Sequence, residues 1–305
     1  MENCLIIINK SAGTSKKISF DTVKKLLGNG YKYACHTIPT DGEPNLDGFK
    51  ALAVCGGDGT LSNVLDKVYD KQKDVFYFPS GTLNDKAKAV KRTNKKTKSS
   101  AQVEQSDSHA VIGIVSGADN TVFSYVFAAG AFTPIGYRAS VKMKKKFGVL
   151  AYLAEVVKEY KVHRINASIK ADGKTYDGEF SLVMFVKSPR CFGFEFNKAY
   201  DKNTESGHML LIRSPKHDGI IGKIEMFFPF FKSFFIGLKK ERDGKIIFKN
   251  IECAKVSLNS TTAFCKDGEK DVRDGDFTIC FQKTECNLNL IDKTKTAVHR
   301  AKADI

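Results

Sequence analysis

The stretch ALAVCGGDGTLSNVLDKVY, residues 51–69, indicates the fold of the first part of the chain most clearly. Its first five residues, Ala51–Cys55, are apolar throughout, as in a strand that is buried on both faces of a parallel sheet. Four residues, Gly56-Gly57-Asp58-Gly59, end this strand, and Thr60 is a good N-cap for a helix over Leu61–Tyr69. A strand that leads through a glycine turn directly into a helix is typical of an α/β unit.

The same alternation extends to both sides of this stretch. Further strands are predicted at Cys4–Ile8, Tyr33–Ile38 and Val75–Phe78, and helices at Ile18–Leu27 and Asn84–Val90. Between Ile38 and Ala51, two prolines and two glycines disfavour a helix, so we expect a loop in place of a crossover helix. The alternation predicts an N-terminal Rossmann-like parallel α/β domain over residues 1–125.

After a lysine-rich interval at residues 91–100 the pattern becomes predominantly antiparallel β. Helices are expected at Phe147–Tyr160 and Ile220–Leu238, and tight turns at Asp172-Gly173, Asp243-Gly244 and Asp274-Gly275. The predicted strands are Val111–Val115, Val122–Phe127, Arg164–Lys170, Glu179–Lys187, Met209–Arg213, Lys245–Phe248, Ala254–Leu258 and Phe277–Phe281. This pattern predicts a second, β-sandwich-like domain over residues 126–285.

Composition excludes several classes of protein. With 42% hydrophobic and 27% charged residues, the chain is neither disordered nor a coiled coil as a whole. No apolar stretch reaches the roughly 18 residues that a membrane-spanning helix needs. The start of the chain lacks the basic region and the long apolar run of a signal peptide, so we expect a cytoplasmic protein. The eight cysteines include no C-x-x-C pair, and we expect neither a disulfide framework nor a zinc site.

The net charge of +15 favours a polyanionic partner. Nucleic acid, a phosphate-bearing small molecule and an anionic lipid surface all fit this charge. We expect no nucleic acid, because no helix-turn-helix, RRM or zinc-finger pattern accompanies the basic residues.

The glycine turn at Gly56–Thr60 carries the strongest chemical signal. Glycines let a backbone approach a ligand closely, and the following helix presents N–H groups and a partial positive charge, both of which suit a phosphate. Asp58 does not favour phosphate alone, but it fits this place if it holds Mg²⁺ directly or through water. A tight strand-to-helix turn without a ligand is the simpler alternative.

Two other polar loops follow predicted parallel strands. Asn9–Gly13 comes after the first strand and Pro79–Asp85 after a later one. Because ligands of open α/β sheets bind at the carboxyl edge of the strands, the three loops together predict a nucleotide-phosphate site.

The three loops, in this order and spacing, resemble the catalytic domain of the diacylglycerol kinase family, as in bacterial soluble lipid kinases. The resemblance continues through Phe127–Gly130, Gly148–Tyr152 and Lys266–Glu269. It implies that ATP binds the α/β domain, that a lipid substrate enters against the second domain, and that residues 286–305 return to the first domain. Thr37 or Thr40 is implied as a further ATP contact. The full set of implied ATP-binding residues is Asn9, Lys10, Ser11, Ala12, Gly13, Thr40, Gly56, Gly57, Asp58, Gly59, Thr60, Leu61, Ser62, Asn63, Gly81, Thr82 and Asn84.

Glu269 matches the general base of that family, and with Asp58 it forms the predicted catalytic pair. The base would accept the proton of the lipid hydroxyl as its oxygen attacks the γ-phosphate. The Asp-Gly-Glu tripeptide also occurs at residues 41–43 and 177–179, but only the copy at 267–269 follows a predicted strand late in the chain.

The sequence departs from the family at four places. Lys10 replaces a proline, Ser80 replaces an apolar residue, and Val111 stands in a segment that normally carries a carboxylate. A structural Mg²⁺ loop that is normally rich in Asp corresponds to residues 204–208, where Glu205 is the candidate metal ligand.

A phenylalanine-rich segment points to a membrane surface. As a helix, residues 226–240 place Phe227, Phe230, Phe231, Phe234, Phe235 and Leu238 on one broad face, with lysines around it. Aromatic and basic residues together are typical of an interfacial helix, whereas a core helix packed on the second domain is the alternative. The basic runs at residues 91–98 and 142–146 would also approach an anionic bilayer.

These patterns predict a lipid kinase that is peripherally associated with an anionic membrane and uses ATP and Mg²⁺ to phosphorylate a diacylglycerol-like alcohol. A non-catalytic relative that binds lipid or nucleotide is one alternative, suggested by Val111 and Ser206. A NAD kinase is the other, since it shares the Gly-Gly-Asp-Gly turn. The sequence leaves open whether the chain forms a homodimer.

Overall fold

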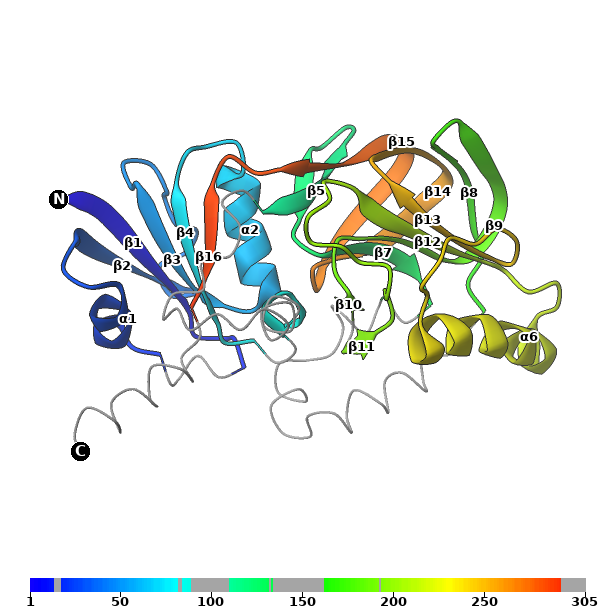
Figure 1. Ribbon diagram of the computed structural model, residues 1–305, viewed down its shortest axis with the longest axis horizontal. Coiled ribbons are helices and arrows are strands. Elements are labelled where there is room, and N and C mark those ends of the chain that lie inside the picture. The colour runs from blue at the N-terminus through cyan, green and yellow to red at the C-terminus, as the bar shows by residue number, and fades with distance from the viewer. Residues whose placement is uncertain are drawn as a thin grey trace. The chain divides into compact units, whose positions relative to one another are not determined.

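The computed structural model (Figure 1) describes residues 1–13, 18–81, 84–88, 110–131, 133, 162–191 and 193–291 of the chain. It contains two compact units. The first contains Met1–Ala110 and the residues from Thr284 onward, and the second is Val111–Lys283. Within the described ranges, no helix has both the length and the apolar character needed to cross a membrane.

The first unit contains a five-stranded parallel sheet in the order β16-β4-β3-β1-β2. Its strands are β1 (Glu2–Asn9), β2 (Tyr31–Ile38), β3 (Ala51–Gly56), β4 (Asp74–Pro79) and β16 (Asn287–Leu290). The last of them comes from the far end of the chain and pairs with β4, with Leu288 opposite Val75. The predicted parallel α/β sheet is confirmed.

The strand order changes direction beside β1. Strands β2 and β3 follow each other in sequence but lie on opposite sides of β1, so their connection passes across that strand. The connecting residues 39–50 form turns and loop without a helix, as expected from their prolines and glycines. Ligands of open α/β sheets bind at such a reversal, which lies here between the carboxyl ends of β1 and β3.

Among the described residues of this unit, α1 and α2 lie on opposite faces of the sheet. Helix α1 (Phe20–Leu27) is capped by the Ser19 hydroxyl, which accepts a hydrogen bond from the N–H of Thr22 at 3.2 Å. Its Val23 packs with Cys4 and Phe78 on one face of the sheet. On β4 the neighbouring Tyr77 points the other way and donates a hydrogen bond to Asp58 of α2 (Asp58–Val68). Helix α2 therefore lies on the opposite face.

Helix α2 begins earlier than the sequence predicts. Its N-cap is Gly57, which has no side chain to bond the first turn, and Thr60 lies inside the helix. The prediction of Thr60 as the N-cap is therefore wrong. Its hydroxyl instead accepts a hydrogen bond from the first loop, so a long-range contact outweighs the capping preference. After β4, only residues 85–88 of the predicted helix 84–90 are described as helical.

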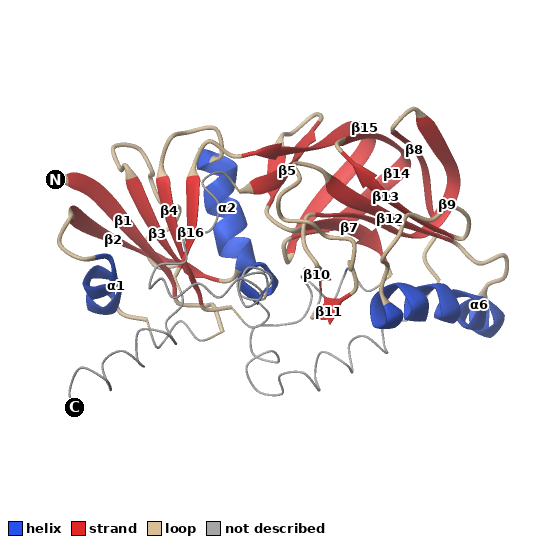
Figure 2. Cartoon of the chain, viewed as in Figure 1, coloured by secondary structure: helices blue, strands red, loops and turns tan. Residues whose placement is uncertain are grey.

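The second unit is built on an antiparallel sheet, and strands make up most of it (Figure 2). The strand order is β13-β12-β9-β7-β14-β15-β5-β6, and β8 pairs with both β14 and β9. The strands are β5 (Val111–Ser116), β6 (Thr121–Phe123), β7 (Val126–Gly130), β8 (Ile165–Ala171), β9 (Lys174–Val186), β12 (Gly207–Arg213), β13 (Ile246–Ile251), β14 (Cys253–Lys266) and β15 (Glu269–Lys283). A small separate hairpin joins β10 (Arg190–Cys191) to β11 (Phe194–Glu195). The predicted β-sandwich-like second domain is confirmed.

The sheet curls because two long strands share two partners. Strands β9 and β14 both pair with β7 along one part of their length and with β8 along another. The curl encloses a core that includes Phe127, Phe180 and Phe264. The rings of Phe127 and Phe264 stack with their centres 4.4 Å apart. This packing explains why so many phenylalanines lie in the strands of this unit.

Two local predictions for this unit are wrong. Asp274-Gly275 is not a hairpin turn but lies within β15, where Gly275 has a φ of 58° opposite the register shift of β14. Cys253 and Cys280 form a disulfide because the register of β14 and β15 places them directly opposite each other. Their 27-residue separation in sequence gave no sign of this pairing.

One helical segment covers the outer face of this sheet. It consists of α6 (Gly219–Phe231) and the π-helical turn η2 (Lys232–Ile236), with Pro229 inside α6. Met226, Phe230 and Phe234 pack with Leu210 and Phe248 of the sheet in a second core. The other predicted helix, residues 147–160, lies outside the described residues.

Candidate functional site

Two of the three predicted loops are in direct contact at the carboxyl edge of the parallel sheet. The N–H of Ser80 donates to the carbonyl oxygen of Gly56 at 2.7 Å. A Cβ atom added at Gly81 would lie 2.7 Å from the Cα atom of Gly57. Because real Cβ atoms do not approach a backbone this closely, glycine is required where these two loops meet.

The first loop is tied to the same place through Asn9. The Asn9 side-chain amide donates to the Thr60 hydroxyl at 2.9 Å, and its oxygen accepts the N–H of Ser11 at 2.9 Å. A Cβ at Gly56 would lie only 2.4 Å from the Cβ of Thr60. The three loops therefore form one structure, in which the glycine turn lies between the other two.

Asp58 fastens the third loop to the start of α2. Its side chain is 7% exposed in the first helical turn. One carboxylate oxygen accepts the Tyr77 hydroxyl at 3.2 Å, and the other accepts the N–H of Asp85 at 2.8 Å. Sequence reasoning missed both partners, because neither belongs to the glycine motif. The only hint was that Asp85 is the last residue of the third loop, Pro79–Asp85.

The beginning of α2 can bind an anion. The first N–H groups of a helix have no acceptor within the helix, and the helix dipole adds a partial positive charge there. The cap residue Gly57 makes no side-chain hydrogen bond that would occupy these groups. The turn Gly57–Thr60 is therefore suited to a phosphate group that lies against it.

The remaining predicted ATP-binding residues differ in how exposed their side chains are. Leu61 and Ser62 are fully buried in α2, so their side chains have no surface for a ligand. Asn63 and Thr40 are exposed. Asn84 has a φ of 49° and donates to the carbonyl oxygen of Gly81 at 2.8 Å, which closes the third loop on itself. Thr82 lies outside the described residues.

In the second unit, Asp267 anchors a hairpin turn. Asp267 and Gly268 join β14 to β15 with φ values of 49° and 99°. The buried carboxylate accepts backbone N–H groups from Ser124, Tyr125 (3.0 Å) and Val126 (2.9 Å). Burial raises the pKa of this carboxyl group, and the hydrogen bonds from these N–H groups oppose the rise. The same bonds separate β6 from β7, where the sequence predicts one continuous strand.

This anchored turn presents Glu269. Glu269 is the first residue of β15 and is exposed, opposite Lys266 in the hairpin. The Lys266 ammonium group is buried and donates to the Thr121 hydroxyl at 2.6 Å. Lys266 and Asp267 thus hold the turn, and Glu269 is the member of the motif whose carboxylate reaches the surface.

The loop that corresponds to the family's structural Mg²⁺ loop is held by a lysine. Lys187, 3% exposed, donates from its ammonium group to the carbonyl oxygens of Thr204 (2.5 Å), Ser206 (2.7 Å) and Asp201 (3.3 Å). The Glu205 carboxylate instead pairs with Lys283 at 2.7 Å. The residues here do not fit a metal ion, because an ammonium group already occupies the oxygens that would bind it. Within the described ranges, no group of three or more His, Cys, Asp or Glu side chains could hold a metal ion.

The phenylalanine-rich segment contributes to both the core and the surface. Phe230 and Phe234 are 4% and 8% exposed and pack against the sheet. The prediction that these two residues contact a membrane is therefore wrong, and the core alternative holds for them. The opposite face of α6 and η2 carries eight exposed large apolar residues: Ile220, Ile221, Ile224, Phe227, Phe228, Phe231, Phe235 and Ile236. We call this set the apolar face of α6.

Comparison with known proteins agrees with the motifs. Residues 3–115 match the family described as Diacylglycerol kinase catalytic domain. A diacylglycerol kinase of Staphylococcus carnosus is 24% identical over 68% of this chain and 71% of its own, and one of Staphylococcus aureus (strain JH9) is 26% identical over 68% and 69%. The resemblance to this family is confirmed in sequence over the segment that contains the three loops.

Solved structures share the fold over nearly the whole chain. A crystal structure of a diacylglycerol kinase from Bacillus anthracis has a TM-score of 0.57 at 14% identity and covers 96% of this chain and 98% of its own. A second crystal structure from that organism has a TM-score of 0.65 at the same identity and coverage. At this identity the likeness shows a common two-unit fold.

Proposed function

We propose that this chain, whose residues 3–115 match the diacylglycerol kinase catalytic domain, is an ATP-dependent lipid kinase. The observation that carries the proposal is the close contact of Gly57 and Gly81 beside the start of α2. Neither glycine has a side chain to block the start of α2, so a ligand at this edge of the sheet would meet the backbone of the turn. The match at residues 3–115 supports a kinase acting on a lipid alcohol.

In this proposal the three loops bind the phosphates of ATP. The N–H groups of Gly57–Thr60 would face the phosphate oxygens, and Lys10, exposed in the first loop, would add positive charge. Mg²⁺, when bound, would neutralise charge on the transferring phosphoryl group. Asp58 is the carboxylate within this turn. Because both of its oxygens already accept a hydrogen bond, it would reach the ion most simply through water.

Glu269 would serve as the general base. As the lipid hydroxyl oxygen forms its bond to the γ-phosphorus, Glu269 accepts the hydroxyl proton, and the bond from phosphorus to the bridging oxygen of ADP breaks. The anchored turn supports this role, since an exposed carboxylate on a rigid hairpin can be aimed at a substrate with little loss of entropy.

A diacylglycerol-like substrate remains in the bilayer, so the enzyme must reach it there. The apolar face of α6 would enter the interface of an anionic membrane, with lysines such as Lys223 and Lys240 at the level of the head groups. Peripheral attachment from the cytoplasm and a part in phospholipid synthesis follow from this proposal.

The test is transfer of labelled γ-phosphate from ATP with Mg²⁺ to diacylglycerol in vesicles. We expect Glu269→Gln to lower kcat by roughly 10²- to 10⁴-fold, the usual contribution of a positioned base. Glu252→Gln is the matched control, because Glu252 is another exposed glutamate of the same unit. Unchanged transfer in Glu269→Gln would exclude it as the base.

The same assay separates the alternatives. ATP binding without phosphorylation of any lipid alcohol or of NAD would indicate a non-catalytic relative. Phosphorylation of NAD in place of lipid would indicate a NAD kinase.

A further inference from the structure

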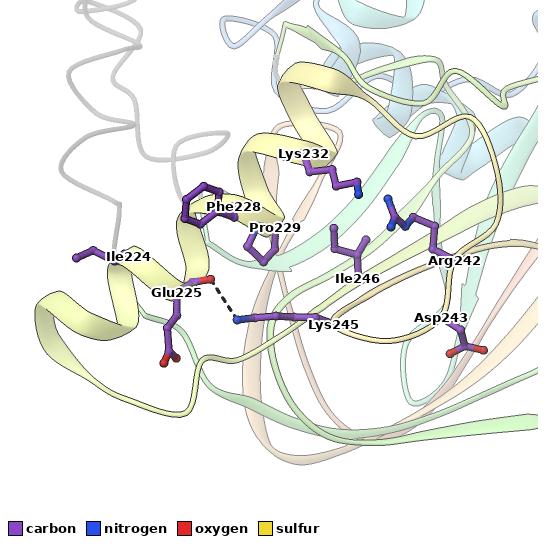
Figure 3. A pocket seen from close by; sticks show the side chains of 9 residues that line it. All are labelled: Ile224, Glu225, Phe228, Pro229, Lys232, Arg242, Asp243, Lys245 and Ile246. Carbon is purple, nitrogen blue, oxygen red and sulfur yellow. Dashed lines mark hydrogen bonds between the residues drawn. The ribbon is translucent and has the colours of Figure 1, made fainter.

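A pocket of about 540 Å³ lies where α6 and η2 meet the loop that leads into β13 (Figure 3). Ile224, Phe228 and Pro229 of α6 line it from one side, and Ile246 lines it from the sheet. Lysine and arginine side chains complete the wall. The pocket therefore combines an apolar surface with positive charge, which is the combination that an anionic amphiphile needs.

The two acidic residues of this pocket are bonded to groups outside its lining, whereas three other lining residues are basic. Glu225 accepts hydrogen bonds from His217 Nδ1 at 2.7 Å and from the N–H of Lys216, and the bond from His217 lowers its pKa. Asp243 pairs with Lys174 of β9, which lowers the pKa of Asp243. Both carboxylates are thus engaged with groups that do not line the pocket.

The lining cations are available for a ligand. The Lys245 ammonium group donates to the backbone oxygen of Glu225 at 3.2 Å, a neutral acceptor (Figure 3). Within the described residues, neither Lys232 nor Arg242 has an acidic partner for its side chain, and Figure 3 shows their ends extending to the same part of the pocket. Two unpaired cations side by side favour an anion such as a phosphate.

The apolar wall continues into the apolar face of α6. Ile224 and Phe228 belong to both, and Phe228 is 68% exposed. A free phosphate would gain nothing from this wall, whereas a phospholipid can place its acyl chains along Phe228 and its phosphate between Lys232 and Arg242. Basic side chains with apolar stems commonly lie this way at the edge of a bilayer.

We propose that this pocket binds the head group of an anionic phospholipid of the bilayer, separate from the lipid that is phosphorylated. The inference rests on the proposed function insofar as that function brings the chain to a membrane. Anionic phospholipid then fixes α6 at the interface, and membrane binding depends on these two cations more than on the net charge of the protein.

The experiment measures sedimentation of the full chain with vesicles, without ATP. One set of vesicles is phosphatidylcholine alone, and the other contains a share of phosphatidylglycerol. We expect binding to the second set, and expect Lys232→Gln with Arg242→Gln to weaken it on the order of 30-fold, since two charges near the surface are lost. Lys32→Gln with Lys170→Gln is the matched control, because it removes two exposed lysines of β2 and β8 and changes the net charge equally.

If both double variants weakened vesicle binding equally, the proposed binding site in the pocket would be excluded, and general attraction between charges would explain the binding. Loss of the preference for phosphatidylglycerol in Phe228→Ser, but not in Val272→Ser at another exposed apolar position, supports the shared apolar wall. If inorganic phosphate at millimolar concentration displaced the protein from the vesicles, a free phosphate rather than a phospholipid would be the ligand of the pocket. Because no arm measures phosphorylation, failure here leaves the kinase assay of Glu269→Gln as a separate result.

Discussion

The two units hold their loops in different ways. At the carboxyl edge of the parallel sheet, the loops approach each other closely at Gly57 and Gly81 and are joined by single hydrogen bonds. Asp58 accepts two further hydrogen bonds there, from the N–H of Asp85 and from the Tyr77 hydroxyl. In the second unit, fully buried charges hold the loops: Asp267 accepts three N–H groups, and Lys187 donates to three carbonyl oxygens.

This difference helps to distinguish residues that stabilise the loops from residues that can contact a ligand. In both regions the aspartate of the motif accepts hydrogen bonds from another segment, and in our proposal the group that meets the substrate directly is its neighbour. Beside Asp58 that neighbour is the backbone of the glycine turn, and beside Asp267 it is the exposed Glu269. A buried charge with several partners contributes mainly to stability, whereas a glycine contact leaves room for a ligand.

Asp267→Asn gives the largest expected loss of stability. The amide keeps one oxygen acceptor but turns an N–H₂ group toward backbone donors, so we expect the free energy of unfolding to fall by about 3 kcal/mol. Urea unfolding measures this. Asp172→Asn is the control, because Asp172 also begins an Asp-Gly turn with a positive φ but is exposed. A loss as small as that of the control would show that the three hydrogen bonds do not anchor the turn.

The second expected effect is a loss of stability in acid that depends on His208. This side chain is buried and stacked on Phe248, and burial, followed by the charge of Lys187, lowers its pKa to about 4. The unfolded state therefore binds the proton first. The contribution of neutral His208 to the free energy of unfolding is therefore fully present above pH 6.5. About 3 kcal/mol of it is lost as the pH falls from 6.5 to 4.

Urea unfolding at pH 7 and pH 4.5 tests this, because His208→Gln removes that part of the loss. Lys187→Met removes the nearby positive charge, so it should raise the pKa of His208 and narrow the range of pH over which stability falls. An equal pH dependence in the wild type and His208→Gln would contradict the assignment to His208.

Asp58→Asn gives the smallest expected change in stability. The close approach of Gly57 and Gly81 remains, and the asparagine loses only one of the two acceptor oxygens. We therefore expect the free energy of unfolding to fall by about 1 kcal/mol. ATP affinity should fall at the same time, since the Asp85 end of the third loop is released. Urea unfolding and calorimetric titration with ATP measure the two effects. If Asp58→Asn destabilised the chain as much as Asp267→Asn, the contrast between the two units would be lost.

Local patterns in the sequence predicted much of the fold. Runs such as Ala51–Cys55 predicted parallel strands, because both faces of these strands are buried and the whole run is apolar. The start of α2 was misplaced because capping preference is weaker than the long-range bond from Asn9 to Thr60. Within the phenylalanine-rich segment, periodicity did not reveal which side faces the sheet, since almost all of its residues are apolar.

Contacts between distant residues were beyond sequence reasoning. The sequence placed the three loops on one edge of the sheet, because parallel strands end together. The hydrogen bond from the N–H of Asp85 to Asp58 was not predicted, because it depends on the path of the chain after β4. The hydrogen bonds from Lys187 to the loop at residues 201–206 were not predicted, because a lysine at the end of a strand is ordinarily solvated. The Cys253–Cys280 pair depends on strand register, which the hydrophobic pattern of the two strands did not fix at that position.

The most direct test of the central claim is an NMR titration of the labelled chain with ATP and Mg²⁺. We predict saturable shifts of the backbone amides of Gly57, Gly59 and Gly81 and of the first loop at Lys10–Gly13, with smaller changes elsewhere in the parallel sheet. Shifts that leave these amides unchanged and concentrate in another part of the chain would contradict the proposed phosphate site.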